Sequence, residues 1–334
     1  MGKMKLPMRN ALQAARTRPR ALRAGDTVGI VAPASHFLRE HFLAGCHALE
    51  RLGYRPFYLP SIFDRDLYFA GSAERRGREL EEMFERDEVK AVVCARGGYG
   101  SNYLLPLLDP EKIRRHPKIF VGYSDITSLL TWMCDAAGLV VFHGPVVARD
   151  FAEADCVNLE AWSMLQNPEA AQLSDTGKGA TALVNGAAQG MLYGGCVSML
   201  VASLGTPYEI QTDDTILFLE DVNTRPYQLD RMLMQLKYAG KFDRVRGMLF
   251  GAMTNCLPET GQPYTLQDVI LRVVGELGIP IGFGFPSGHV DAGNTILPLG
   301  VRASLRVRHD DAQPVRLDFE APVDAAPARV EAAR

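Results

Sequence analysis

Three side chains of types that cooperate in hydrolysis, Ser124, Glu220 and His289, each follow an apolar run and lie beside glycine or a second polar residue. The run 119–121 leads into Gly-Tyr-Ser, and helical spacing starts directly afterwards. This pattern predicts a strand, a sharp turn and a helix, an arrangement that lifts the serine hydroxyl clear of a sheet. Serine, acid and histidine in this order suit a triad in which the imidazole accepts the serine proton and the carboxylate orients the imidazole.

Each of these residues also has a structural interpretation. Serine is a preferred N-cap residue, so Ser124 could do no more than begin a helix. Glu220 and Asp221 could be a solvated pair or a cap for the next helix, and His289 could make a structural hydrogen bond in a loop. Alternation along a strand points Glu220 and Asp221 to opposite sides, so only one of them would face a given site. Position in the fold does not by itself decide between these interpretations.

A second glycine-bearing segment, Ala-Arg-Gly-Gly-Tyr-Gly at 95–100, follows the apolar run 89–94. Its glycines could cradle a phosphate, let the backbone approach a ligand closely, or make a tight turn. No Lys-Ser or Lys-Thr follows, and the full Gly-x-Gly-x-x-Gly spacing is missing, which argues against nucleotide binding. This segment and the serine turn both leave the carboxyl ends of predicted strands, which is the edge where open α/β sheets bind ligands.

Strands and helices are predicted to alternate along the chain, which indicates an α/β protein with parallel sheets. The run 26–35, the helical spacing at 41–52 and the extended segment 55–59 form a first strand–helix–strand unit. Further strands are predicted at 89–94, 118–122, 139–145, 215–222, 245–251 and 281–289, and further helices at 72–86, 102–108, 159–165, 197–204, 227–238 and 266–277. The segments 296–299 and 303–307 are expected to pair with each other as closing antiparallel strands.

At 334 residues the chain is long enough for about two domains. Between residues 148 and 184 the apolar density falls while Asn, Gln, Asp and Gly increase, which predicts a connector. We therefore expect an N-terminal α/β domain over 20–165, which carries the serine and the glycine loop. A C-terminal β/α domain over 180–320 would carry the glutamate and the histidine, so activity would depend on how the two domains pack together.

Composition restricts the classes of partner. A formal net charge of -3 without a basic cluster argues against nucleic acid, and no apolar run is long enough to cross a bilayer. The 6 cysteines are scattered without a Cys-x-x-Cys pair, which indicates free thiols in a reducing compartment. Residues 1–23 form a basic leader that is expected to be loose and that lacks the apolar core of a secretory signal, and 321–334 should be a frayed tail. We expect a cytoplasmic protein with a small-molecule or peptide partner.

The ordered motifs of the chain resemble those of the LD-carboxypeptidase family of serine peptidases, which includes the microcin C immunity peptidases. The resemblance extends from Gly25 to about Val307. The motifs that carry it are Gly-Asp-Thr-Val-Gly-Ile-Val-Ala-Pro-Ala-Ser at 25–35, Ala-Arg-Gly-Gly-Tyr-Gly at 95–100, Val-Gly-Tyr-Ser-Asp-Ile-Thr at 121–127, Phe-His-Gly-Pro at 142–145, Gly-Gly-Cys-Val-Ser-Met-Leu at 194–200, Leu-Glu-Asp-Val at 219–222, Pro-Tyr-Gln-Leu-Asp-Arg-Met-Leu at 226–233 and Gly-Phe-Pro-Ser-Gly-His at 284–289.

The resemblance implies a role for each site residue. Ser124 would be the nucleophile, His289 the general base and acid, and Glu220 the carboxylate that orients the histidine. The backbone N–H groups of Gly98 and Asp125 would form the oxyanion hole. The resemblance also implies an N-terminal flavodoxin-like or class I glutamine amidotransferase-like domain, a C-terminal β/α domain, a homodimer, and a reaction that needs no metal or organic cofactor.

The implied reaction is hydrolysis of the amide bond between an L-configured centre and a terminal D-amino acid, with release of D-alanine from the tetrapeptide of recycled cell-wall muropeptides. Arg96, Tyr99 and Arg225 lie in or beside the motifs and are candidates for substrate binding. Arginine suits a terminal carboxylate because its guanidinium offers two parallel donors. Surface or interdomain ion pairs are the alternative role for both arginines.

Two other functions stay open. Members of the microcin-immunity branch cleave an aminoacyl-nucleotide amide and need aromatic side chains that stack on a base. Of the 2 tryptophans, Trp132 lies in the predicted nucleophile helix, so only Trp162 or tyrosines could provide that platform. A non-catalytic ligand-binding α/β protein would retain the pocket without the chemistry, and the presence of all three triad residue types argues against it.

Overall fold

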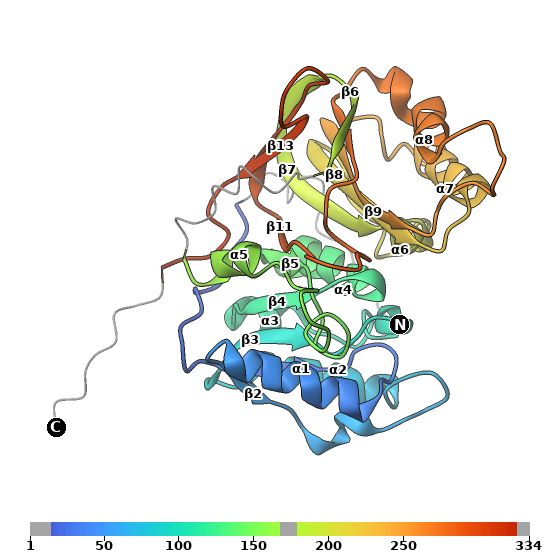
Figure 1. The fold of residues 1–334 in the computed structure, drawn as a ribbon. Coiled ribbons are helices and arrows are strands. Elements are labelled where there is room, and N and C mark those ends of the chain that lie inside the picture. Colours follow the sequence, from blue (N-terminus) through green and yellow to red (C-terminus); the bar gives the residue numbers. More distant parts are fainter. Residues whose placement is uncertain (1–14, 168–178, 326–334) are drawn as a thin grey trace.

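Two β-sheets, each with helices packed against it, form the body of the protein and lie one above the other in Figure 1. The structure is a computed structural model, and it describes residues 15–167 and 179–325. The arrangement confirms the expected α/β class with two domains. Within the described ranges, no helix combines the length and the hydrophobicity needed to cross a membrane.

The first sheet has the strand order β11-β5-β4-β3-β1-β2. Strands β1 to β5 are parallel neighbours in the 2-1-3-4-5 order of flavodoxin-like sheets, whereas β11 pairs with β5 in the antiparallel sense. The central strands β3 and β4 are buried along nearly their whole length, as continuous apolar runs predict for a sheet covered on both faces. The strands are β1 (Thr27–Val31), β2 (Arg55–Phe57), β3 (Val89–Cys94), β4 (Ile119–Gly122), β5 (Val141–His143) and β11 (Leu297–Leu299).

The second sheet has the strand order β13-β12-β7-β8-β9-β10-β6. Its centre, β7 to β10, is parallel, and antiparallel strands continue it on both sides. The strands are β6 (Thr181–Val184), β7 (Gly186–Cys196), β8 (Thr215–Val222), β9 (Gly247–Thr254), β10 (Ile281–Phe283), β12 (Arg302–Val307) and β13 (Val315–Phe319).

Helix α4 lies between the two sheets, because it contacts β4 and β5 of the first sheet as well as β7 and α6 of the second unit. The helix that follows the serine turn is therefore part of the contact between the domains. The helices are α1 (Arg39–Arg51), α2 (Ala73–Glu85), α3 (Pro110–Arg115), α4 (Thr127–Trp132), α5 (Leu159–Trp162), α6 (Val197–Ala202), α7 (Pro226–Tyr238) and α8 (Leu266–Val274).

Two segments differ from the predictions. The segments 296–299 and 303–307 do not pair with each other, because β11 joins β5 of the first sheet while β12 pairs with β7 and β13 of the second. A strand from the C-terminal part of the chain thus completes the N-terminal sheet. The predicted helix 102–108 is also wrong: a 3-10 turn over Ser101–Tyr103 is followed by α3, which Pro110 and the N-cap Asp109 begin.

The described ends of the chain are packed against the domains. Arg16 forms an ion pair with Asp135 at 3.5 Å, and Val323 is buried. The expectation of a loose leader and a frayed tail is therefore wrong for residues 15–23 and 321–325. The remainder of both segments lies outside the described residues.

Candidate active site

Ser124 stands on a strained turn between β4 and α4. Its backbone has a φ of 64°, a left-handed value that is uncommon for residues other than glycine. Tyr123 occupies the N-cap position of the 3-10 turn Ser124–Ile126, so Ser124 does not cap this helical segment. A Cβ on Gly97 would lie 2.9 Å from Ser124 Cβ and 3.2 Å from Ser124 Oγ. A strained serine at a strand-to-helix turn, with glycine beside it, has the geometry of a nucleophile elbow.

The glycine loop 95–100 is held against the loop that follows β1. Gly98 has a φ of 104°, and a Cβ on it would lie 2.5 Å from Ser35 Oγ. Tyr99 N–H donates to Ser35 Oγ at 3.1 Å, and the buried Arg76 donates to Gly100 O at 2.9 Å. Backbone conformation and the close approach of Ser35 therefore both require glycine at position 98.

Asp125 links this loop to the serine turn. Its carboxylate Oδ2 accepts Ser101 N–H at 2.8 Å, and its carbonyl oxygen accepts the Ser101 hydroxyl at 2.6 Å. Burial raises the pKa of the Asp125 carboxyl. The two predicted oxyanion donors, Gly98 N–H and Asp125 N–H, thus belong to two segments that these hydrogen bonds tie together.

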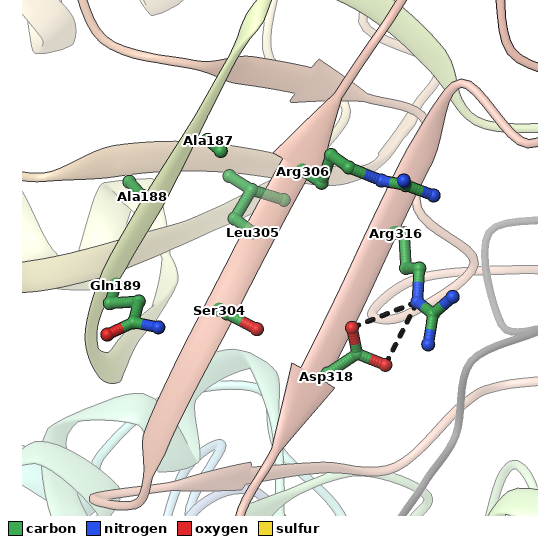
Figure 2. A pocket seen from close by; sticks show the side chains of 8 residues that line it. All are labelled: Ala187, Ala188, Gln189, Ser304, Leu305, Arg306, Arg316 and Asp318. Carbon is green, nitrogen blue, oxygen red and sulfur yellow. Dashed lines mark hydrogen bonds and ion pairs between the residues drawn. The ribbon is translucent and has the colours of Figure 1, made fainter.

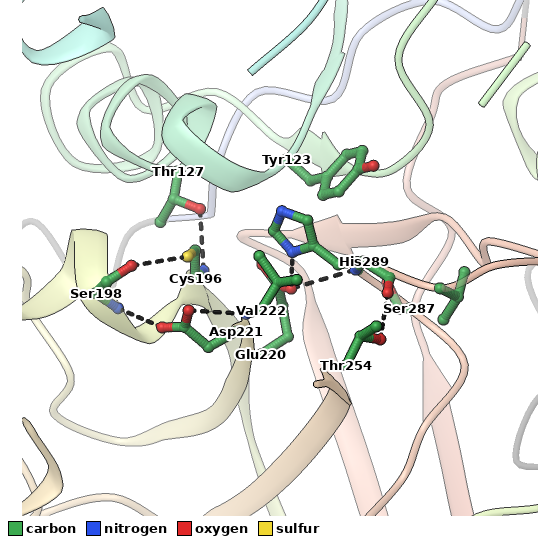
Figure 3. A network of polar contacts seen from close by, with 12 residues as sticks. Tyr123, Thr127, Cys196, Ser198, Glu220, Asp221, Val222, Thr254, Ser287 and His289 are labelled. Carbon is green, nitrogen blue, oxygen red and sulfur yellow. Dashed lines mark hydrogen bonds and ion pairs between the residues drawn. The ribbon is translucent and has the colours of Figure 1, made fainter. Parts of the chain in front are cut away.

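Glu220 and His289 form a direct pair, drawn in Figure 3. His289 Nδ1 lies 2.7 Å from Glu220 Oε2, and His289 N–H donates to the same oxygen at 3.3 Å. Thr254 Oγ1 donates to the carbonyl oxygen of His289 and holds its backbone. The Glu220 side chain is fully buried, whereas 12% of the His289 side chain is exposed. With Nδ1 engaged by the carboxylate, Nε2 is the ring nitrogen that remains for a reacting group.

The local backbone directs Glu220 and His289 toward each other. The register between β8 and β9 shifts between Leu219 and Asp221, on either side of Glu220. Such irregularities re-aim side chains and are common next to active sites. On the histidine side, Gly288 has a φ of 111°, and a Cβ on it would lie 2.5 Å from Glu220 Oε2. Only glycine lets the histidine loop approach the carboxylate this closely.

The Glu220 carboxyl is held in its ionised form. Burial alone would raise its pKa, but hydrogen bonding and electrostatic interaction with His143 and His289 outweigh burial and lower the pKa from 4.5 to about 2. His143 Nε2 is 3.7 Å from Glu220 Oε1, which is too long for a good hydrogen bond, so His289 makes the stronger contact. The ring of Tyr123, the neighbour of Ser124, packs on the His289 ring with centroids 5.0 Å apart.

Asp221 points away from this pair (Figure 3). Its Oδ2 accepts Ser198 N–H at 2.9 Å in the first turn of α6, and its Oδ1 accepts the Thr224 hydroxyl at 3.0 Å. Of the two adjacent carboxylates, one therefore contacts the histidine and the other holds the start of a helix.

The Gly-Gly-Cys motif at the end of β7 brings the two domains together. A Cβ on Gly195 would lie 2.6 Å from Thr127 Oγ1 of α4, and Cys196 N–H donates to that hydroxyl at 3.0 Å. A Cβ on Gly194 would lie 2.0 Å from Phe218 O of β8. Because α4 begins directly after the serine turn, these close approaches hold that turn against the strands that carry the carboxylate.

The three predicted substrate-binding residues lie at the surface. Arg96 donates to His36 O at 3.0 Å, and Tyr99 is 41% exposed. The Arg225 side chain is 61% exposed and pairs with Glu259 at 2.6 Å, which is the ion-pair role considered as its alternative. Their part in substrate binding stays a prediction.

Sequence reasoning assigned no role to two residues near the pair. His143 is fully buried, and its Nδ1 lies 3.2 Å from Ser287 Oγ. Arg149 donates to the Tyr123 hydroxyl and, at 3.2 Å, to Val290 O directly after the histidine. His143 lies in the Phe-His-Gly-Pro motif, but this motif had no assigned function, and Arg149 lies in none of the motifs.

A pocket of about 420 Å³ lies over β7, β12 and β13 (Figure 2), and none of the candidate catalytic residues lines it. In the described ranges, no group of three or more His, Cys, Asp or Glu side chains could hold a metal ion. All six cysteines are free and buried, which confirms the prediction of free thiols.

Comparisons with known proteins agree with the motifs. Residues 28–144 match the family model of the LD-carboxypeptidase N-terminal domain, and residues 189–305 match that of the LD-carboxypeptidase C-terminal domain. A probable murein peptide carboxypeptidase from Bacillus subtilis is 39% identical over 298 residues, which cover 88% of this chain and 93% of that protein. The microcin C7 self-immunity protein of Escherichia coli is 28% identical over 319 residues, which cover 85% of this chain and 91% of that protein.

A solved structure leads to the same family. The crystal structure of muramoyltetrapeptide carboxypeptidase from Oxalobacter formigenes superposes with a TM-score of 0.74 at 27% identity and covers 90% of this chain and 100% of that chain. The two family models together match more than half of the 334 residues. The chain therefore belongs to the LD-carboxypeptidase family of serine peptidases.

Proposed function

We propose that this protein is a serine LD-carboxypeptidase that releases the terminal D-alanine from cell-wall muropeptide tetrapeptides by means of Ser124, His289 and Glu220. The observation that supports it most is the contact of 2.7 Å between the buried Glu220 carboxylate and His289 Nδ1. The ring of this histidine packs on Tyr123, the neighbour of the strained Ser124. Histidine, carboxylate and elbow serine are the components of acyl transfer.

In the proposed reaction, Ser124 Oγ attacks the carbonyl carbon of the L,D amide while His289 Nε2 accepts the hydroxyl proton. Glu220 stabilises the imidazolium that forms and keeps its ring in place. The negative oxygen of the tetrahedral intermediate is received by Gly98 N–H and Asp125 N–H. His289 then gives the proton to the leaving nitrogen, and a water molecule hydrolyses the ester in a second round of the same steps.

A carboxypeptidase must also hold the free carboxylate of its substrate. Arg96 and Arg225 stay the candidates proposed from the sequence, and Tyr99 lies beside the proposed oxyanion donor. Of the two arginines, Arg225 would have to leave its ion pair with Glu259, whereas Arg96 donates a hydrogen bond to a neutral acceptor, the carbonyl oxygen of His36. Arg96 is therefore the better candidate.

The same proposal includes the wider setting. Domains over 20–165 and 180–320, a homodimer, and a cytoplasmic role in peptidoglycan recycling fit a peptidase whose catalytic groups come from two sheets. The relatives named as carboxypeptidases support the substrate class.

A microcin-type immunity function is the second candidate, and one observation favours it. Tyr68, Tyr99 and Tyr103 are 52%, 41% and 49% exposed and form one aromatic cluster beside the glycine loop, where a base could stack. Trp162, considered for this purpose from the sequence, is only 2% exposed and is not available as a platform.

A substrate panel separates these functions. We would incubate the protein with a tetrapeptide ending in D-alanine, the same peptide ending in L-alanine, the C-terminally amidated D-alanine peptide, and an aminoacyl sulfamoyl adenosine. The proposal predicts release of D-alanine from the first substrate only. Cleavage of the nucleoside conjugate alone would establish the second candidate, and no cleavage of any substrate would favour a non-catalytic binding protein.

A further inference from the structure

His143 faces the carboxylate oxygen of Glu220 that the histidine of the proposed triad does not contact. It ends β5 of the N-terminal sheet and is completely buried, whereas Glu220 belongs to β8 of the second sheet. Its Nε2 is 3.7 Å from Glu220 Oε1, while His289 Nδ1 contacts the other oxygen, Oε2. The carboxylate is thus placed between two imidazoles that come from different parts of the chain.

In the described part of the chain, both His143 Nε2 and Glu220 Oε1 are buried without a hydrogen bond. Burying an unpaired polar atom is costly, and here the two unpaired atoms face each other. Their separation is about half an ångström beyond a normal N–H···O bond, and such contacts often tighten when substrate binds.

The ring of His143 has little freedom to turn away. Its Nδ1 lies 3.2 Å from the hydroxyl of the buried Ser287, and the rings of Phe218 and Tyr123 pack against it edge-on with centroids 4.9 Å and 5.8 Å away. If the Ser287 hydroxyl donates to Nδ1, the proton of a neutral ring is on Nε2 and faces the carboxylate. The opposite tautomer would turn a lone pair toward a negative oxygen.

We propose that His143 is a positioning residue that presents Nε2–H to Glu220 Oε1 and so fixes the carboxylate that orients His289. It does not touch the reacting atoms. Because His143 belongs to the N-terminal sheet, this contact also fixes the position of the Glu220 carboxylate, in the second domain, relative to the domain that carries Ser124. The inference rests on the proposed function only for its effect on catalysis.

Titratable groups from both domains surround this region. From the N-terminal sheet, Tyr123, Arg149 and Asp150 face this region, and burial raises the pKa of the Tyr123 hydroxyl well above its usual value. From the second sheet, Asp221 and the thiols of Cys196 and Cys256 adjoin Glu220, and burial raises the pKa of both thiols. Removing the Nε2–H donor would leave the Glu220 charge less stabilised, so an imidazolium at His289 would be favoured. The ascending limb of kcat/KM should then move to higher pH.

The test uses two substitutions of similar size in the full-length protein. His143→Leu removes the donor, and His143→Gln keeps an N–H group near the position of Nε2. We expect His143→Leu to lower kcat for D-alanine release at least about tenfold with KM little changed, and to move the ascending limb up by on the order of one pH unit. His143→Gln should recover most of kcat and return the limb toward its wild-type position.

A limb at the wild-type position in His143→Leu, or equal losses in both variants, would show that His143 only fills space. A second measurement does not depend on catalysis: two-bond ¹H–¹⁵N spectra of histidine-labelled wild type should show a neutral His143 with the proton on Nε2. A proton on Nδ1, or on both nitrogens at neutral pH, would overturn the proposal. If the wild type releases no D-alanine, the proposed function fails, and this spectrum still decides the role of His143.

Discussion

Replacing Gly288 by alanine should separate Glu220 from His289 without removing either side chain. The new Cβ would lie 2.5 Å from Glu220 Oε2 and 2.8 Å from its Cδ, while the backbone has a φ of 111°. Because Glu220 is fully buried and Gly288 directly precedes the histidine, either the carboxylate or the histidine loop has to move.

The size of the effect follows from these distances. The contact would be roughly an ångström shorter than a normal carbon–oxygen contact. A shift of that size lengthens the 2.7 Å bond between His289 Nδ1 and Glu220 Oε2 beyond hydrogen-bond range. Disabling the acid of a serine triad lowers kcat by about 10⁴, so a displaced but still charged Glu220 should cost about 10²–10⁴ in kcat. Backbone strain should add about 1–3 kcal/mol of destabilisation.

Gly293→Ala is the matched control, because Gly293 also has a positive φ, 65°, but no atom within 4 Å of the position of a new Cβ. It should cost about 1 kcal/mol of stability and leave kcat near the wild-type value. We would measure D-alanine release together with thermal unfolding for both variants. A folded Gly288→Ala protein with kcat within about threefold of wild type would refute the importance of this approach.

Three further results are expected. Glu220→Gln should lose most activity, because Glu220 is the carboxylate that contacts His289. Asp221→Asn should lose much less activity and mainly destabilise α6, because Asp221 accepts hydrogen bonds from Ser198 and Thr224. Kinetics and thermal unfolding of both variants would test this ranking, and the reverse ranking would contradict the assignment. Because folding favours the ionised Glu220, with a pKa of about 2 against 4.5, its contribution of about 3 kcal/mol is present above pH 4.5 and is lost as pH falls toward 2. Acid unfolding of Glu220→Gln should lack that part of the pH dependence, and identical curves for both proteins would argue against it. Gly195→Ala should reduce both stability and kcat, because its Cβ would lie 2.6 Å from Thr127 Oγ1 at the domain contact; unchanged kinetics would show that the contact does not position the serine turn.

Most strands and helices were predictable because buried parallel strands are continuous apolar runs and surface helices have a clear period, but the strands at 181–184, 186–196 and 315–319 were not predicted. The sharp turn at Ser124 was also predictable, since Gly-Tyr-Ser between such a run and a helix matches the pattern of a nucleophile elbow. By contrast, the pairing of β11 with β5 was not, because 297–299 is a short strand whose partner lies far away in the sequence.

The candidate site was likewise only partly predictable from the sequence. Alternation along β8 indicated that Glu220 and Asp221 face opposite sides, but it could not say which one meets the histidine. That choice depends on the register shift in β8 and on the close approach of Gly288, which are tertiary features. His143 could not be assigned either, because its neighbours Glu220 and Ser287 belong to other segments of the chain.

The most direct test of the account is the rate of D-alanine release from an L,D-tetrapeptide by the wild type and by Ser124→Ala, purified side by side and shown to unfold at similar temperatures. The account predicts clear release by the wild type and a loss of about 10³-fold or more in kcat for the variant. Release by Ser124→Ala at a rate close to that of the wild type would contradict the assignment of Ser124 as the nucleophile.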